Sequence, residues 1–124
     1  MRRRIRESML PGLRTLAVAA SLALVLGCAG VRGARLYASG TDALDRGDGA
    51  QAVADLEHAA ELLPDASPIH NNLGLAYVQV GRDAEARAAF ERAVELDCSN
   101  DAARHNLRAA EAGRLRPPEA SNVP

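Results

Sequence analysis

The chain is poor in the residues that large mixed cores and charged sites need. Its 124 residues include no Trp, two Tyr, one Phe, two Cys and no Lys, and aromatic residues make up 2% of the whole. Two cysteines cannot form a disulfide framework, and this length gives room for one modest domain. What is abundant is Ala, Leu, Arg and Glu, which all favour the helix. Small and medium side chains suit closely spaced helices, so the composition predicts an all-α fold.

The sequence also lacks the patterns of common catalytic and metal sites. His58, His70 and His105 do not have metal-ligand spacing, and no cluster of Cys or carboxylates completes a site. There is no glycine-rich phosphate loop and no pairing of a nucleophile with a base. We therefore expect no enzyme activity, no metal and no cofactor, and we expect the histidines to be surface or packing residues.

The charge is unevenly distributed along the chain. Residues 1–27 hold five of the 15 basic residues and one of the 16 acidic ones, Glu7. The remaining residues, 28–124, therefore carry ten basic and 15 acidic side chains, a net charge of -5. A mildly acidic domain gives little electrostatic support to nucleic-acid binding, so we expect no nucleic-acid partner.

Residues 1–27 have the features of an export signal. The cationic residues 1–14 precede an uncharged apolar run, 16–26, which as a helix would span roughly 16 Å, about half a bilayer core. That is short for a transmembrane helix and typical of a signal peptide. The run ends in Val25-Leu26-Gly27-Cys28, which resembles the lipobox of bacterial lipoproteins. The resemblance implies cleavage after Gly27 and covalent lipid on Cys28.

Acyl chains on one cysteine anchor durably, at about 0.8 kcal/mol per buried CH₂. In the lipoproteins of enteric bacteria, an Asp directly after the cysteine marks retention in the inner membrane. Ala29 occupies that position here, so the resemblance implies that the protein is anchored in the outer membrane and faces the periplasm. Residues 28–32 are expected to be a short linker of at most about 14 Å, which keeps the domain against its leaflet. An uncleaved signal anchor, an ordinary signal peptide with a chance Cys28, and twin-arginine export through the paired Arg residues near Met1 stay open.

The rest of the chain repeats with a period of about 34 residues. The aligned pairs are Gly40 with Gly74, Gly47 with Gly81, Ala52 with Ala86, Leu56 with Phe90, Ala59 with Ala93, and Leu62 with Leu96. This pattern resembles the tetratricopeptide repeat, most fully in the second copy, 67–100, with Asn72-Leu73-Gly74 and Ala76-Tyr77. The first copy, 33–66, departs at Ser39 and Ala43, where the family usually has Leu and Tyr. A third copy begins at Asp101 and stops after one helix.

The resemblance implies two helix-turn-helix repeats and a capping helix, a short α-solenoid over 33–114, with residues 115–124 as a disordered tail. The helices are expected over 34–46, 49–63, 68–80, 84–97 and 101–113. Gly47 and Gly81 are placed to end the first helices in the left-handed conformation, and Ser67-Pro68 is typical of a cap followed by proline. In the second helix, Ala52, Leu56, Ala59 and Leu63 share one face. In the capping helix, the residues expected to face the preceding repeat are Ala103, Leu107 and Ala110, and those expected in water are Arg104, Arg108 and Glu111.

In this family the first helix of each repeat lines a concave groove. The resemblance therefore implies a peptide-binding groove, suited to an extended peptide or to a helix with apolar anchors. Its lining residues would be Tyr37, Thr41, Leu44, Asp45, Asn71, Asn72, Leu75, Val78, Gln79, His105 and Ala109. Some relatives clamp a terminal carboxylate with Lys, Arg and Asn. Here only Asn72 matches, and Tyr37, Ala102 and Asn106 occupy the basic positions, so that ligand is not expected.

These patterns together predict a lipid-anchored protein–protein interaction module, an adaptor or scaffold in a cell-envelope assembly for pili, secretion, the outer membrane or the cell wall. The alternative is a structural lipoprotein that self-associates through the leading edge of the first helix, which has no obvious cap. Cys98 is the remaining thiol once Cys28 is acylated. It either forms a disulfide with a partner or a second copy, or is partly buried in a turn.

Overall fold

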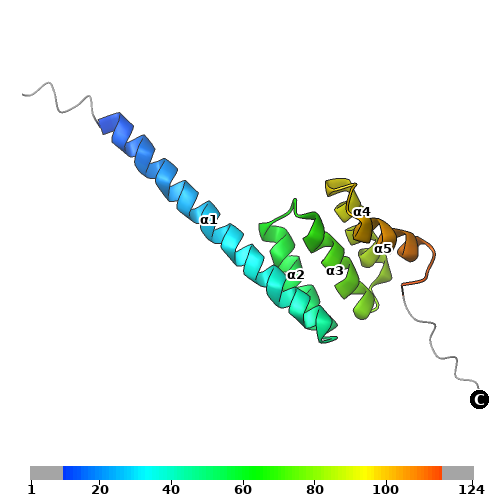
Figure 1. Cartoon of the computed structure of the whole chain (residues 1–124). Coiled ribbons are helices and arrows are strands. Elements are labelled where there is room, and N and C mark those ends of the chain that lie inside the picture. Colours follow the sequence, from blue (N-terminus) through cyan, green and yellow to red (C-terminus); the bar gives the residue numbers. More distant parts are fainter. Residues whose placement is uncertain (1–9, 116–124) are drawn as a thin grey trace, which may run out of the picture. The chain divides into compact units, whose positions relative to one another are not determined.

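The computed structural model describes residues 10–115, with side chains from residue 27 onward. It contains five helices in series, and these described residues include no strand, as the composition predicts. The helices are α1 (Leu10–Asp45), α2 (Gly49–Leu62), α3 (Ser67–Gln79), α4 (Asp83–Leu96) and α5 (Asp101–Glu111) (Figure 1). The ends of the predicted signal peptide and of the predicted tail, residues 1–9 and 116–124, lie outside the described residues.

Helix α1 begins earlier than predicted. It starts at Leu10 and not near residue 34, so residues 28–32, expected as a linker, are helical. Gly27, Gly30 and Gly33 each weaken a helix by about 1 kcal/mol relative to Ala, but the Ala, Leu and Arg residues around them favour the helix. The chain divides into two compact units, Met1–Val31 and Arg32–Pro124, so α1 contributes to both. None of the described helices has the length and apolar character needed to cross a membrane.

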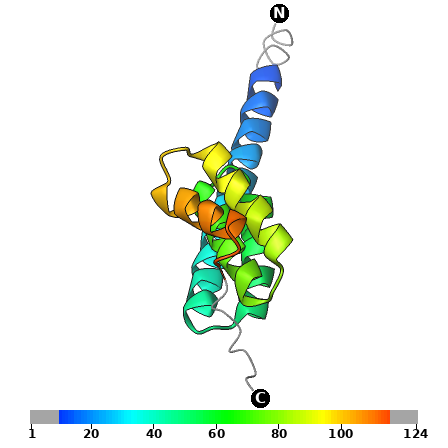
Figure 2. The same ribbon diagram turned by 90° about the vertical axis from the view of Figure 1, so that its right-hand side faces the viewer.

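Within the second unit the helices form hairpins in chain order. Helix α2 contacts α3, α3 contacts α4, and α5 packs against α4 (Figure 2). Two hairpin turns are alike because Gly47 and Gly81 both have a φ of 77°. The N–H of Gly47 bonds to the carbonyl of Leu44 at 3.0 Å, and that of Gly81 bonds to the carbonyl of Val78 at 3.1 Å. The left-handed backbone conformation at the end of a helix costs less free energy for glycine than for any other residue. The predicted role of Gly47 and Gly81 is therefore confirmed.

Each hairpin is closed by a large side chain that sits on a glycine of the preceding helix. Phe90 and Leu56 are fully buried, and they occupy the same position in the two copies of the repeat. A Cβ atom added to Gly74 would lie 2.5 Å from Cε1 of Phe90, and one added to Gly40 would lie 2.6 Å from Cγ of Leu56. The absence of these Cβ atoms lets the two helices of each repeat approach closely.

The predicted cap of α3 is wrong. The residue that precedes the helix is Ala66, and no side chain caps the helix. The hydroxyl of Ser67 is buried and donates to the carbonyl of Ala93 at 2.9 Å. The same hydroxyl accepts a hydrogen bond from the amide of Asn100 at 2.9 Å, and the Asn100 side chain caps α5 through the N–H of Ala103. Ser67 therefore joins the ends of three helices.

The C-terminal end of the stack is closed as predicted. In α5, Ala103 is buried and Leu107 is half-buried, whereas Arg104 and Arg108 are exposed. Arg108 stands one repeat after Gly74, at a position where packing against a second helix would need a small residue. A long charged side chain there suits a helix face that is open to water, as in the capping helix of such an array.

The leading edge of the first repeat is polar, which corrects the expectation that it has no cap. In the second repeat, Leu73, Ala76 and Ala89 are buried in the cluster that joins it to the first. The residues one repeat earlier are Ser39, Asp42 and Asp55. Ser39 donates to Asp55 at 2.7 Å, the amide of Gln51 donates to the other Asp55 oxygen at 2.9 Å, and Asp42 pairs with Arg46. The polar groups of this edge are therefore satisfied within the chain.

Candidate functional site

The residues predicted to line the groove come from α1, α3 and α5, the first helices of the three copies. We call the surface that they form the first-helix face. The predicted members are Tyr37, Thr41, Leu44 and Asp45 of α1, Asn71, Asn72, Leu75, Val78 and Gln79 of α3, and His105 and Ala109 of α5, and the structure adds Asn106 of α5.

A row of polar side chains crosses the first-helix face from α1 to α5. The amide nitrogen of Asn72 donates to the Thr41 hydroxyl at 3.1 Å and to the Tyr37 hydroxyl at 3.4 Å. Asn71 donates to the side-chain oxygen of Asn72 at 3.3 Å, and Asn106 donates to that of Asn71 at 2.9 Å. These side chains form one continuous chain of hydrogen bonds, so they fix the spacing of the three helices.

Asn106 belongs to this row although the groove prediction did not include it. The signal was present, because Asn106 stands one repeat after Asn72 and has the same residue type. The hydroxyl of Thr41 donates to the carbonyl of Tyr37 at 2.8 Å, which fixes its orientation on α1. Among the predicted ligand contacts, Thr41, Asn71 and Asn72 are thus also structural residues.

A second band on the same face is apolar. Leu44, Leu75, Val78 and Ala109 are half-buried, so each leaves part of its apolar surface open. Gln79 is exposed, but its amide donates to the carbonyl of Leu44 at 3.0 Å and ties α3 to α1. Apolar side chains that the fold leaves partly open beside a fixed polar row are the composition of a protein-binding surface.

The two ends of the face differ in charge. His105 is exposed on α5, and Asp45 is exposed at the last residue of α1. Asp45 forms no ion pair with any described residue. The negative end of the α1 dipole lies at this point, and the last turn of α1 contains no basic residue.

A polar cluster that the sequence did not predict joins the two repeats. The Tyr77 hydroxyl donates to Glu57 at 2.7 Å, and the Arg82 guanidinium lies 4.4 Å from the centre of the Tyr77 ring. Arg82 also bonds to Glu85 at 3.0 Å and lies 3.5 Å from Glu57. Burial and the bond to Glu57 raise the pKa of Tyr77 to about 12. The bond between Arg82 and Glu85 lowers the pKa of the glutamate and raises the pKa of the arginine.

The remaining candidate residues stand apart from the first-helix face. Cys28 and Cys98 are both exposed, so the expectation that Cys98 is partly buried is wrong. Cys98 lies in the turn between α4 and α5. Across the part of the chain that the structure describes, no group of His, Cys, Asp and Glu could hold a metal ion.

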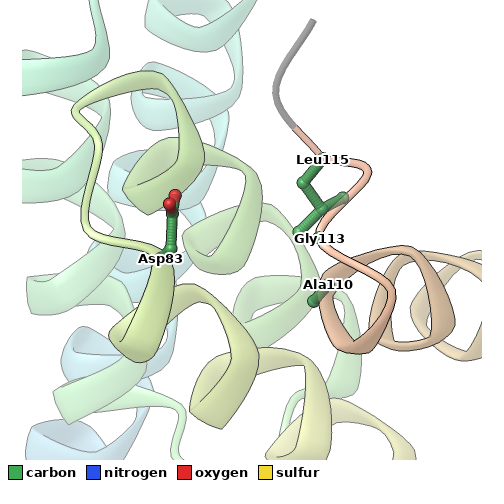
Figure 3. A pocket seen from close by; sticks show the side chains of 4 residues that line it. All are labelled: Asp83, Ala110, Gly113 and Leu115. Atoms are coloured by element: carbon green, nitrogen blue, oxygen red, sulfur yellow. The ribbon is translucent and has the colours of Figure 1, made fainter. Parts of the chain in front are cut away.

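A small cavity lies between the start of α4 and the segment that follows α5. Its volume is about 70 Å³, and its lining includes Asp83 on one side and Ala110, Gly113 and Leu115 on the other (Figure 3). Sites for small molecules usually have volumes of roughly 300–1,000 Å³. This cavity has room for a few water molecules, so it is not a ligand site.

The fold and this face define an all-α solenoid of the tetratricopeptide type. The model of the tetratricopeptide repeat family matches residues 67–100, which confirms the second predicted copy as such a repeat. A tetratricopeptide repeat is a protein–protein interaction module. Among curated proteins, the Hsp70-Hsp90 organizing protein of Triticum aestivum is 37% identical over 67 residues. These cover 54% of this chain but 12% of that protein, so the resemblance concerns a small part of the relative.

Proposed function

We propose that the chain is a lipid-anchored adaptor of the bacterial cell envelope, and that its first-helix face binds another protein. The observation that carries the proposal is the open apolar band of Leu44, Leu75 and Val78 beside the fixed polar row. The row holds α1, α3 and α5 at constant spacing, so the band is presented to a partner with little ordering cost. No catalytic or cofactor chemistry is needed for this role, and we propose none.

The membrane attachment rests on the N-terminal segment that ends at Cys28. A cationic leader, an apolar run and a lipobox-like sequence precede Cys28, and the cysteine is exposed, so its sulfur is accessible to an acylating enzyme. The location that this favours is the outer membrane, with the domain in the periplasm. The assemblies that such adaptors serve in the envelope include those of pili, secretion, the outer membrane and the cell wall.

The name of the wheat relative says that it organises Hsp70 and Hsp90. We do not carry a chaperone ligand over to this chain, because the basic residues that clamp a terminal carboxylate in some relatives are Tyr37, Ala102 and Asn106 here. What is carried over is the coarser role of bringing proteins together.

An adaptor is favoured over a self-associating protein by both ends of the stack. The leading edge holds Ser39, Asp42 and Asp55 where an interior repeat has Leu and Ala, and α5 turns Arg104 and Arg108 outward. Stacking two copies through like ends would bring side chains of the same charge together and remove them from water, which costs several kcal/mol per ion.

Capture of the tagged chain from its native membranes tests the proposal, with bound proteins identified by mass spectrometry. The test variant is Tyr37→Ala with Leu75→Ala, and the matched control is Arg87→Ala with Glu91→Ala, an exposed ion pair on α4. We expect partners that the test variant loses and the control keeps. Partners that both variants retain would place binding elsewhere, and recovery of the chain alone would favour self-association.

Anchoring is tested separately with Cys28→Ala. We expect the parent chain to incorporate labelled palmitate and to sediment with membranes, and the variant to do neither. A variant that stays membrane-bound would instead support an uncleaved signal anchor.

A further inference from the structure

The members of the first-helix face, all of which the structure describes, include no Lys or Arg. The two arginines nearest to the face on α5 point elsewhere, because Arg104 pairs with Asp101 at 3.3 Å and Arg108 donates to the carbonyl of Arg104 at 3.2 Å. Their repeat equivalents, His70 and Gly74, also lie away from the face, since Gly74 meets Phe90 of α4. A carboxylate brought onto this face would lose water and gain only neutral partners, which is unfavourable.

The charge that the face does present is negative. Asp45 is exposed beside Leu44, at the negative end of α1. The wider unit has the same sign, since residues 32–115 contain nine Arg against 14 Asp and Glu. Five of these arginines already pair with acidic side chains, namely Arg46, Arg82, Arg87, Arg92 and Arg104. A partner with positive charge is therefore attracted to the domain and finds an unpaired carboxylate at one end of the apolar band.

The width of the face sets the length of the segment that it can hold. Three helices at the usual separation of 8–10 Å span about 20 Å from α1 to α5. That distance corresponds to roughly 13 residues of helix or 6 residues of extended chain. Apolar side chains on one side of such a segment can reach Leu44, Leu75 and Val78, while its polar side faces the Asn row.

We propose that the first-helix face binds a basic segment of its partner, and does not require a terminal carboxylate. The segment places apolar side chains on Leu44, Leu75 and Val78 and a Lys or Arg beside Asp45. This inference rests on the proposed adaptor function and states the chemistry of the partner.

Selection from a random library of 12-residue peptides tests the inference. The library is made in two formats, one with an amidated C-terminus and one with a free carboxylate, and is presented to the full chain in mild detergent. We expect both formats to yield the same sequences, rich in Lys or Arg together with Leu, Ile, Val or Phe. Asp45→Asn should weaken the selected peptides about two- to fivefold, as for an exposed ion pair, and added salt should reduce that difference.

Two further variants make the result unambiguous. Leu75→Ala should abolish enrichment, and Glu91→Gln on α4, a matched change of charge, should leave it intact, with circular dichroism showing that each variant is folded. Selection of acidic sequences, or binding that requires the free carboxylate, would overturn the inference. If Leu75→Ala still abolished that binding, the adaptor function would stand. Two results would overturn both the inference and the adaptor function. One is the absence of enrichment in both library formats, and the other is enrichment that neither Leu75→Ala nor Asp45→Asn changes.

Discussion

Gly74 offers a direct test of how the second repeat is packed. The change Gly74→Ala adds one methyl group, which would lie 2.5, 2.7 and 2.8 Å from three ring atoms of Phe90. Carbon atoms in contact prefer about 3.5–4.0 Å, so the ring or the helix must move by about 1 Å. Phe90 is fully buried and its ring is rigid, which leaves it little room to turn aside.

The expected loss of stability follows from two opposing terms. Overpacking of a core typically costs about 1–3 kcal/mol. Replacing Gly by Ala within a helix stabilises the folded state by up to about 1 kcal/mol, because the unfolded chain loses conformational freedom and Ala has the higher helix propensity. With the full stabilisation of about 1 kcal/mol, we expect Gly74→Ala to lower the free energy of unfolding by up to about 2 kcal/mol. In a domain of this size each kcal/mol corresponds to about 4–8 °C in Tm.

Urea unfolding followed by circular dichroism measures this change on the full chain in mild detergent. Phe90→Leu alone should cost about 1–2 kcal/mol, because buried volume is lost. The double variant should be at least about 1 kcal/mol more stable than the sum of the two changes predicts, since the smaller side chain makes room for the methyl group. Strict additivity, or a more stable Gly74→Ala variant, would refute the proposed packing.

Three other predictions concern polar groups. The pKa of Tyr77 is raised from 10.0 to about 12, so the stability that its hydrogen bond contributes is complete below pH 10 and is lost as the pH rises towards 12. Titration of tyrosinate absorbance, with the other tyrosine changed to Phe, should show that Tyr77 ionises late. The change Glu57→Gln should lower the pH at which Tyr77 ionises. Ser67→Ala removes one buried and one partly buried hydrogen bond and should lower the free energy of unfolding, measured with urea, by about 1–2 kcal/mol; an unchanged midpoint would contradict its joining role. Ser39→Leu with Asp55→Ala introduces the apolar residues found one repeat later and should raise the mass in sedimentation above that of the parent chain, whereas an unaltered mass would show that the polar edge does not limit stacking.

The sequence predicts the helical stack well because its strongest signals are local or periodic. The constant spacing of the repeat, the left-handed Gly47 and Gly81, and the alternation of small residues with Leu56 and Phe90 each follow from the geometry of a single hairpin. The polar face of α5 follows from the same periodicity. These features depend on short-range contacts, so one sequence is enough to find them.

The failures involve side chains whose partners are distant in the sequence. Ser67 precedes a proline at the start of a helix and so resembles a cap, but its hydroxyl bonds to the carbonyl of Ala93, 26 residues away. The polar leading edge could have been predicted by comparing Ser39 and Asp55 with the residues one repeat later. The bond from Tyr77 to Glu57 has no such signal, because it depends on how two repeats pack.

The first helix shows a different limit. The lipobox-like sequence and the short apolar run suggested that a linker separates Cys28 from the domain, yet α1 is continuous from Leu10 to Asp45. Pattern alone could not locate the start of this helix, since Ala, Leu and Arg favour helix on both sides of the cysteine.

The central claim is that the first-helix face is the surface through which this protein binds another. Site-specific photocrosslinking in native membranes tests it most directly, with the photoreactive residue placed at Leu75 on that face and, in a parallel chain, at Glu91 on α4. We expect a discrete crosslinked partner from position 75 and none from position 91. A partner captured from position 91 but not from position 75 would contradict it.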